Sequence, residues 1–286
     1  MRRLSDRLSY LVSGITGRLD QKPHCPACES RAAIVCDRKW FHTLFECQNC
    51  GLLYRFPSES AKQTADFYQA GYSEPQATDM PDDTALASLV ATNFKDTDLD
   101  RHYHLRVIQA LGVKPGMRVL DYGANWGYAT LQFKRLGFDV TAFDISRRMA
   151  AFADKIGVKV HTSIENVGKG FDAVYSCHVL EHTPNPRQAI LDQLSLVKPG
   201  GIVIGHTPNG SKQYREQRKN AFHRSWGQAH PVLLTEKFIQ GVAGQRPYIA
   251  TSDDRPEVLQ WDHKTQVIGP LDTSGLLFAL KRVGSI

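Results

Sequence analysis

The chain has 286 residues and a mass of 32.0 kDa, which is enough for about two domains of ordinary size. Hydrophobic residues make up 42% and charged residues 22%, and the mean hydropathy is −0.35, so the composition excludes disordered, collagen-like and disulfide-scaffold proteins. Lys and Arg outnumber Asp and Glu by 35 to 29, but this excess lies in residues 1–24 and 211–224 and therefore does not indicate a general nucleic-acid-binding face.

Apolar residues recur at helical spacing from residue 3 to residue 19, with arginine and serine between them. This pattern predicts a short basic amphipathic helix within an N-terminal segment 1–22. The helix either packs on the body of the protein or makes peripheral contact with an anionic membrane surface. Charged residues interrupt it too often for a secretory signal, and no apolar run approaches the ~18 residues that span a bilayer. We therefore expect a cytoplasmic protein.

Two Cys-x-x-Cys pairs follow, separated by 18 residues. This spacing is typical of a tetrahedral four-thiolate zinc site in which each pair lies on a tight turn. The runs 31–36 and 40–46 between the pairs predict two strands that cannot bury a core by themselves, so metal binding would supply much of the folding free energy. We predict a zinc ribbon over residues 23–57 whose ion is structural and is held by Cys25, Cys28, Cys47 and Cys50.

An iron–sulfur cluster or a redox Cys-x-x-Cys is an alternative use of these thiols, although the paired turns favour zinc. Cys36 and Cys177 remain outside the set, and we interpret each as a buried, unreactive thiol.

From residue 112 onward, apolar strands alternate with amphipathic helices, whereas residues 58–111 read as a helical linker or cap that ends in a helix over 99–112. The alternation predicts a doubly wound, Rossmann-like α/β sheet over residues 112–286. Ligands of such sheets bind at the carboxyl ends of the strands, where the winding reverses. The predicted strands end near Asp121, Asp144, His161, Cys177 and Thr207, with helices over 147–156 and 186–197.

The loop D-Y-G-A-N-W-G at 121–127 carries the clearest chemical signal. Gly123 allows a sharp turn and Gly127 allows a helix to begin close to a ligand, but the third glycine of a dinucleotide fingerprint is missing. A carboxylate at Asp121 would repel pyrophosphate and pair with an ammonium group, and Asp144 would accept hydrogen bonds from ribose hydroxyls. These features favour a nucleoside that carries an amino acid and no phosphate.

The segments V-L-D-Y-G-A-N-W-G, F-D-A-V-Y-S-C-H-V-L-E-H-T-P-N-P and L-V-K-P-G-G-I-V-I-G-H-T-P-N resemble successive motifs of class I S-adenosylmethionine-dependent methyltransferases over about residues 103–210. The cysteine pairs and F-Y-Q-A-G-Y at 67–72 are similar to the zinc-binding part of a subgroup that methylates sugars and other small polar metabolites. The C-methylating sugar enzymes of that subgroup carry a further carboxyl-terminal domain, and we do not expect one in this chain.

By that resemblance Asp121, Gly123 and Gly127 would hold the methionine end of S-adenosylmethionine, Asp144 the ribose, and Ile145 would flank the adenine. Asn125 stands where the family usually has glycine, and its short side chain tolerates the left-handed conformation that the turn needs. The predicted cofactor-binding set is Asp121, Tyr122, Gly123, Asn125, Gly127, Asp144 and Ile145.

Methyl transfer from a sulfonium is an in-line displacement, so orientation supplies much of the acceleration, and a base is needed only to deprotonate an acceptor. His178 and His182 follow a predicted strand at i, i+4 spacing on one face of a helical turn, and His206 ends the next strand. We predict His178 and His182 as candidate bases. The alternative is that His182 braces the loop and His206 is a structural strand-end residue.

A long polar insert, residues 208–234, contains Tyr214, His223, Trp226 and His230, and we interpret it as an acceptor pocket or lid. Its basic side chains would grip a phosphate or carboxylate, unless the insert is simply a solvated surface. These side chains are Arg215, Arg218, Lys219 and Arg224.

A helix is predicted from Thr235, and strands are predicted at 247–252 and 274–282, the last of which would complete the sheet. The leading hypothesis is a methyltransferase that acts on an O or N of a sugar, glycan precursor or other small polar metabolite. One alternative is an RNA base methyltransferase, although the predicted ribbon is electrically neutral and nucleic acid is therefore an unlikely partner. Another is a catalytically silent binding protein that keeps the fold. The sequence does not identify the oligomeric state.

Overall fold

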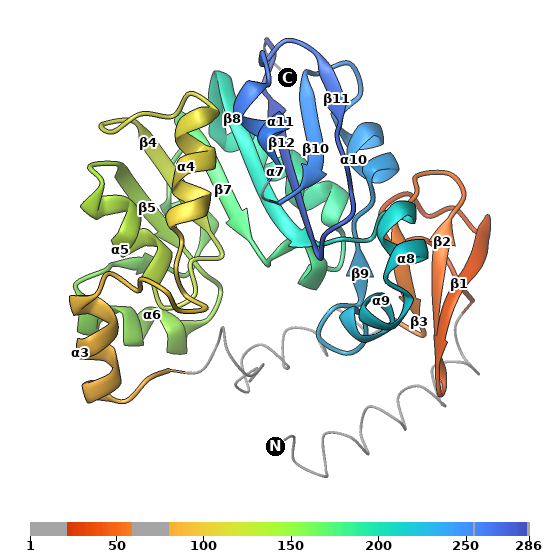
Figure 1. The fold of residues 1–286 in the computed structure, drawn as a ribbon, viewed down its shortest axis with the longest axis horizontal. Coiled ribbons are helices and arrows are strands. Elements are labelled where there is room, and N and C mark those ends of the chain that lie inside the picture. The colour runs from red at the N-terminus through yellow and green to blue at the C-terminus, as the bar shows by residue number, and fades with distance from the viewer. Residues whose placement is uncertain (1–21, 59–79, 254, 285–286) are drawn as a thin grey trace.

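The computed structural model describes residues 22–58, 80–253 and 255–284, so the predicted helix at 3–19 and the motif at 67–72 lie outside the described residues. Two sheets organise the described chain, an eight-stranded sheet with helices on both faces and a four-stranded sheet that carries the cysteines (Figure 1). Among the described residues, no helix has the length and apolar character needed to cross a bilayer.

The large sheet has the order β11-β10-β12-β8-β7-β4-β5-β6. From β4 the chain winds outward through β5 and β6, then returns to place β7 on the other side of β4, so the winding reverses between β4 and β7. This confirms the predicted doubly wound sheet. The strands are β4 (Arg118–Tyr122), β5 (Asp139–Phe143), β6 (Val160–His161), β7 (Phe171–Cys177), β8 (Val197–Pro208), β10 (Tyr248–Ser252), β11 (Gln266–Ile268) and β12 (Gly275–Lys281).

The sheet is not parallel throughout, because β12 runs antiparallel to both β8 and β10. Successive residues of its central strands point to opposite faces and both are buried, as Val119 and Leu120 show by belonging to different core clusters. Strand β11 and helices α3 and α11 were not predicted, because the short segments that form them show no clear periodicity.

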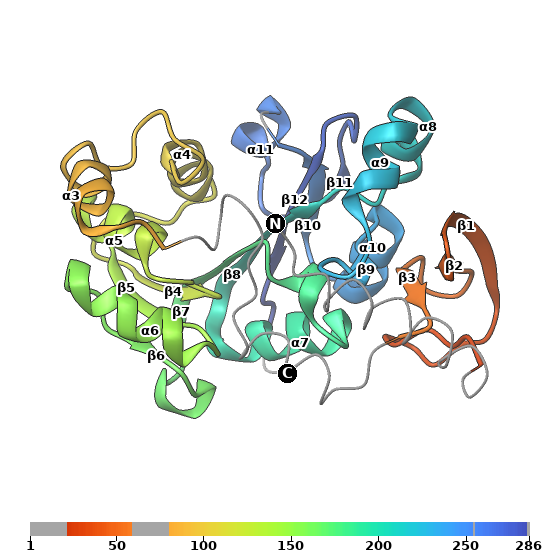
Figure 2. The same cartoon turned by 90° about the horizontal axis from the view of Figure 1, so that it is seen from below.

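Helices cover both faces of this sheet. Helices α4 and α11 contact each other on one face and α7 lies on the other (Figure 2). Leu105 and Ile108 of α4 pack in the same cluster as Val119, so α4 is part of the sheet's core rather than a separate linker. The helices are α3 (Asp83–Ala91), α4 (His102–Ala110), α5 (Tyr128–Arg135), α6 (Arg147–Ala153), α7 (Pro186–Leu196), α10 (Glu236–Ala243) and α11 (Pro256–Gln260), with 3₁₀ turns η1 (Asp154–Ile156), η2 (Ile164–Asn166) and η3 (Leu180–His182).

The small sheet is an antiparallel ribbon with the order β1-β2-β3-β9. Two of its strands were predicted, whereas β3 and β9 were not. Strand β9 comes from the insert after the large sheet's β8 and pairs Leu233 with Leu53. The ribbon strands are β1 (Ala33–Lys39), β2 (His42–Cys47), β3 (Leu53–Phe56) and β9 (Val232–Leu233), and the insert also forms α8 (Lys212–Gln217) and α9 (Lys219–Ser225).

Candidate functional site

The loop between β4 and α5 lies where the winding of the sheet reverses. Gly123 and Gly127 both adopt left-handed backbone conformations, with φ of +84° and +81°. A Cβ atom at Gly123 would lie 2.2 Å from Val179 Cγ2, and one at Gly127 would lie 2.7 Å from Val158 Cγ1. The two glycines therefore serve the turn and also its close packing against neighbouring segments.

Asn125 adopts the left-handed conformation expected of it, with φ of +53°. Its side-chain oxygen accepts a hydrogen bond of 2.8 Å from the backbone N–H of Trp126, which stabilises the turn locally. The loop thus keeps its form without a glycine at this position.

Two carboxylates flank this loop, the buried Asp121 and the half-buried Asp144. The Asp144 oxygens accept hydrogen bonds of 2.8 Å from the backbone N–H groups of Asn125 and Ser146. Asp121 accepts a hydrogen bond of 2.6 Å from the Thr130 hydroxyl and is 3% exposed. Burial raises the pKa of both carboxyls, that of Asp121 to about 7. Each oxygen of Asp144 keeps a second lone pair, so this group can accept further hydrogen bonds from a ligand.

The remaining predicted cofactor residues differ in exposure. The ring of Tyr122 packs against that of Phe143, with 5.1 Å between the ring centroids and an angle of 53° between the planes. Burial raises the pKa of the Tyr122 hydroxyl. Ile145 directly follows the half-buried Asp144 and is 51% exposed. An exposed aliphatic side chain beside a hydrogen-bonding carboxylate suits a flat base that sits next to a ribose.

His178 lies at the end of β7 and is oriented by a buried acid. Its Nδ1 is 2.8 Å from Glu181, whose other oxygen accepts a hydrogen bond of 3.0 Å from the Thr207 hydroxyl. Burial opposes ionisation of Glu181, but the hydrogen bond from His178 lowers the pKa of this carboxyl far below its ordinary value. The side chain of His178 is 46% exposed. Partial loss of solvent opposes its charge, yet Cys177 and Glu181 raise its pKa.

The expected placement of His178 and His182 on one helical face is wrong. His178 has a φ of +54° and precedes the short turn η3, so the chain makes no continuous helical turn between the two residues. His182 instead contacts the carbonyl of Ala229 at 2.6 Å and the ring of His230 at 4.9 Å. Burial lowers the pKa of His182.

A polar cluster that sequence reasoning missed lies at the ends of β7 and β8. Cys177 and His206 are register partners in these strands, with 3.7 Å between Sγ and Nδ1. The ring of His104, from α4, lies beside that of His206, with 4.8 Å between the two ring centroids. On the other nitrogen of His206, Nε2 is 3.3 Å from the Asp253 carboxylate. The available signal was the pair Cys177 and His206 at the ends of adjacent strands.

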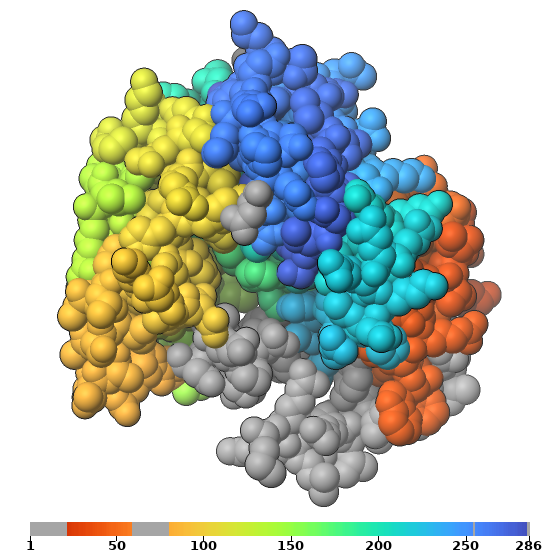
Figure 3. All heavy atoms as spheres, viewed as in Figure 1, coloured from red at the N-terminus to blue at the C-terminus, as the bar shows by residue number. Residues whose placement is uncertain are grey.

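The side chains of this cluster shift one another's pKa values in opposite directions. Although burial disfavours its charge, hydrogen bonds to Asp253 and Cys177 raise the pKa of His206 to about 10. Burial also opposes ionisation of Cys177, but His104 and His178 lower the pKa of its thiol well below the ordinary value. Cys177 is only half-buried and lies beside the His206 ring, whereas the sequence predicted a fully buried thiol. Figure 3 shows this face hollowed between the segment that holds α4 and the C-terminal segment.

The structure brings the four predicted zinc ligands together. All four Sγ atoms lie within 4.8 Å of one another, with Cys25 and Cys50 at 3.5 Å and Cys28 and Cys47 at 3.6 Å. Tetrahedral zinc with Zn–S bonds of about 2.3 Å requires S···S distances of about 3.8 Å, and these two separations are close to that value. The backbone N–H of Cys50 is 3.5 Å from the sulfur of Cys47, as expected where N–H groups stabilise a thiolate.

The insert over residues 208–234 packs on the ribbon, which corrects its interpretation as a lid. Tyr214, Phe222 and Trp226 are buried against Leu44 and Leu53. The amphipathic pattern of α8 and α9 has the ribbon as its apolar partner, and β9 joins the ribbon sheet.

The polar residues of the insert also bond to the ribbon. Arg215 forms an ion pair of 2.9 Å with Glu46 and also contacts Cys36, so its guanidinium is held against the ribbon. His223 and the Trp226 indole both bond to Asp37 at 2.8 Å.

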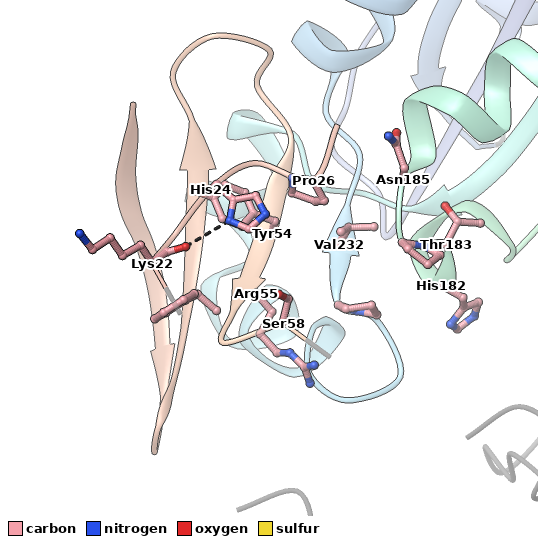
Figure 4. Close-up of a pocket in the computed structure, with 13 residues that line it drawn as sticks. Lys22, His24, Pro26, Tyr54, Arg55, Ser58, His182, Thr183, Asn185 and Val232 are labelled. Carbon is pink, nitrogen blue, oxygen red and sulfur yellow. Dashed lines mark hydrogen bonds between the residues drawn. The ribbon is translucent and has the colours of Figure 1, made fainter. Parts of the chain in front are cut away.

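A cavity of about 320 Å³ lies between the ribbon and the start of α7 (Figure 4). Tyr54 and Arg55 line it from β3, and His182 and Asn185 line it from the opposite side. It contains none of the predicted cofactor residues and is distinct from the loop after β4.

Comparisons with known proteins agree with the fold of the large sheet. A family described as a methyltransferase domain matches residues 97–242. A ubiquinone biosynthesis O-methyltransferase of Maricaulis maris is 33% identical over 105 residues, which cover 33% of this chain and 41% of that protein. A demethylmenaquinone methyltransferase of Renibacterium salmoninarum is 29% identical over 135 residues, 44% of this chain and 55% of that protein.

The chain thus aligns with about two fifths to just over half of the length of these two relatives. The crystal structure of the plantazolicin methyltransferase BpumL with a desmethyl analogue and SAH has a TM-score of 0.50 and 14% identity, covering 78% of this chain and 97% of that one. At this identity the likeness concerns the fold. The family match spans more than half of the 286 residues, and the chain therefore belongs to the class I methyltransferase domain family.

Proposed function

We propose that this chain transfers a methyl group from S-adenosylmethionine to an oxygen or nitrogen of a small molecule. The observation that carries the proposal is the loop after β4, where the winding reverses, together with the doubly hydrogen-bonded carboxylate of Asp144. The cofactor would supply an activated methyl on a sulfonium. The chain's own residues would orient that methyl and the acceptor.

Asp144 would accept hydrogen bonds from the ribose hydroxyls through the lone pairs that Asn125 and Ser146 leave free. Ile145, 51% exposed, would cover one face of the adenine. Asp121 would face the methionine ammonium, and an ammonium nearby would favour the ionised form of this carboxyl against its burial.

His178 is the better placed of the two predicted bases. Its Nδ1 is bonded to the buried Glu181, so Nε2 is the nitrogen left for an acceptor proton. Glu181 fixes the ring's orientation and stabilises the imidazolium that forms when the proton is taken up. His182 is bonded to the Ala229 carbonyl beside the ribbon, and it would instead hold the loop after η3 in place.

The acceptor proposed from the sequence is a sugar, a glycan precursor or another small polar metabolite, and the polar wall of His178 and His206 supports such a molecule. A second candidate is a phenol of the quinone type, because two of the relatives are named for ubiquinone and demethylmenaquinone. The four cysteines are proposed to hold a structural zinc ion, since four filled positions leave none for a substrate.

Calorimetric titration with S-adenosylhomocysteine tests the cofactor site. The wild-type chain should bind it, and Asp144→Ala should weaken binding at least tenfold, because a charge-assisted hydrogen bond contributes about 1.5–3 kcal/mol. Asp139→Ala is the matched control: it removes an exposed carboxylate at the other end of the same strand and should leave binding unchanged. Absence of binding to the wild-type chain would contradict the proposal.

Acceptor classes are separated by incubating the chain with labelled S-adenosylmethionine and either a polar metabolite extract or a set of catechol-like phenols. Transfer of label to one pool identifies the class. His178→Ala should lower the transfer rate by about 10²–10⁴-fold while leaving S-adenosylhomocysteine binding unchanged. Equal rates for His178→Ala and the wild type would remove His178 from the mechanism.

A further inference from the structure

A second cluster of metal-ligating side chains lies at the carboxyl ends of β7 and β8, apart from the four cysteines. It is formed by His104, Cys177 and His206, whose candidate ligand atoms all lie within 4.8 Å of one another. The three residues come from α4, β7 and β8, so the tertiary fold brings together parts of the chain that are distant in sequence.

One separation within the cluster is close to that of a zinc site. A tetrahedral zinc ion with bonds of about 2.3 Å to sulfur and about 2.0 Å to nitrogen requires a sulfur–nitrogen separation of about 3.5 Å. Cys177 Sγ and His206 Nδ1 are 3.7 Å apart. A thiolate with two imidazoles is also a ligand set that binds zinc in preference to magnesium or calcium.

The nitrogens that would not bind a metal already have partners. His206 uses Nδ1 toward Cys177, and its Nε2 contacts the Asp253 carboxylate at 3.3 Å. His104 bonds to the Tyr175 hydroxyl through Nδ1, which leaves Nε2 for an ion. Metal-binding histidines commonly carry such a carboxylate or hydroxyl on the second nitrogen, where it fixes the tautomer and strengthens the ligand.

Asp253 and His206 are packed closely against Gly275 of β12. A Cβ atom at Gly275 of β12 would lie 2.4 Å from an Asp253 oxygen and 2.5 Å from His206 Nε2. Asp253 also accepts a hydrogen bond from the Thr273 hydroxyl. The carboxylate that supports His206 is therefore held from two sides, by a hydroxyl and by close contact with a glycine.

A neighbouring group of possible metal ligands consists of Glu181, His182 and His230. It contains no thiol, so it lacks the sulfur ligand that Cys177 supplies to the cluster at the ends of β7 and β8.

We propose that His104, Cys177 and His206 form a second zinc site whose fourth position is open to an oxygen ligand, with Asp253 and Tyr175 as its supporting partners. In the free protein a water molecule would occupy the open position. A hydroxyl of a small molecule would be the class of ligand that displaces it, because three-ligand zinc sites keep such a position for water or substrate. The binding of the ion does not depend on the proposed methyl transfer.

The metal content of the full-length chain tests this site. Protein produced with added zinc, desalted and measured by mass spectrometry should hold two zinc ions per chain, and Cys177→Ser should hold one. Cys36→Ser, which removes a cysteine outside both clusters, should keep two. Removing Cys25 and Cys28 by Cys25→Ser and Cys28→Ser should also leave one ion, at the second site.

Two further measurements guard against loss of metal through misfolding. Asp253→Asn keeps all three ligands and should weaken the second site's zinc affinity 10–100-fold in a chelator competition, without changing S-adenosylhomocysteine binding. Cobalt added in place of zinc should give a thiolate-to-cobalt absorption band that is reduced in Cys177→Ser and retained in Cys36→Ser.

The outcomes separate this site from the other proposals. A wild-type chain with one zinc ion that Cys177→Ser loses would support the second site and contradict the four-cysteine site. A Cys177→Ser variant with as many ions as the wild type, or a wild-type chain with none, would overturn the proposal. Binding of S-adenosylhomocysteine is read independently in each case.

Discussion

The glycines of the loop after β4 are required for two separable physical reasons. A left-handed φ costs roughly 1–2 kcal/mol for a residue with a Cβ atom, and a Cβ at Gly123 would also lie 2.2 Å from Val179. Gly116 has nearly the same φ, +85°, but a Cβ there would meet nothing within 4 Å. The chain therefore contains its own control for the backbone effect alone.

We expect Gly116→Ala to lower the free energy of unfolding by about 1–2 kcal/mol and Gly123→Ala to lower it by more, because only the second substitution adds a clash. Urea denaturation of both variants measures the difference. Adding Val179→Ala to Gly123→Ala should recover part of the loss. If Gly116→Ala and Gly123→Ala were equally destabilised, packing against Val179 would have no role.

Asp121 gives stability a pH dependence of defined sign. Its pKa in the folded chain is about 7 because of burial, whereas an unfolded aspartate titrates near about 3.9. Between these values the folded chain binds a proton that the unfolded chain does not. Stability from this group is therefore lost as pH rises from about 4 to about 7.

We expect Asp121→Asn to lack this loss. From pH ~5 to pH ~8 the free energy of unfolding of the wild type should fall by about 3 kcal/mol relative to the variant. Chemical denaturation at several pH values measures the two profiles. Asp139→Asn, which changes an exposed carboxylate, should follow the wild type, and a parallel profile for Asp121→Asn would show that the carboxyl titrates normally.

At the scale of elements, the ribbon and the insert after β8 depend on each other. Strand β9 completes the ribbon sheet, and α8 and α9 cover its apolar side. The ion pair between Arg215 and Glu46 is mostly covered, with side-chain exposures of 14% and 23%. Such a pair contributes more to the free energy of unfolding than an exposed pair does, because removal of one partner leaves the other charge poorly solvated and without a counter-charge.

We expect Arg215→Ala to lower the free energy of unfolding by about 2 kcal/mol, since it removes a charged hydrogen-bonding partner of Glu46. Arg218→Ala, an exposed arginine one helical turn away, should change stability by less than about 0.5 kcal/mol. Thermal or urea unfolding of the two variants distinguishes them. Equal changes in the free energy of unfolding would mean that the ion pair between Arg215 and Glu46 contributes nothing beyond the net charge of the insert.

At the scale of the whole molecule, the two sheets have different sources of stability. The large sheet buries apolar side chains on both faces. The ribbon is small, adds a few residues such as Cys47 and Leu52 to one of these clusters, and gathers four cysteines at one point. Removing an ion from the ribbon would therefore affect the ribbon and its attached insert much more than the large sheet.

We expect a strong chelator to increase backbone hydrogen exchange in β1, β2, β3, β9, α8 and α9, while β4, β5 and β8 stay protected. Hydrogen-exchange mass spectrometry with and without chelator measures this. The variant Cys47→Ser should show the same pattern without chelator. Uniform loss of protection over both sheets would mean that the ion stabilises the whole fold rather than the ribbon.

The sequence by itself determined the features that depend on local pattern. Alternating strands and helices indicated the doubly wound sheet, the loop at 121–127 indicated the turn at its switch point, and the cysteine spacing brought Cys25, Cys28, Cys47 and Cys50 together. These features are readable because neighbouring residues encode them through periodicity, backbone conformation and short ligand spacing.

Only the tertiary structure decided which distant residues meet. The antiparallel β12, the pairing of β9 with β3, and the meeting of His104, Cys177, His206 and Asp253 all join positions far apart in the chain. Strand register and helix packing fix these contacts, and no local pattern records them. The insert at 208–234 illustrates the reason, because its apolar residues needed a partner surface and only the folded chain shows that this surface is the ribbon.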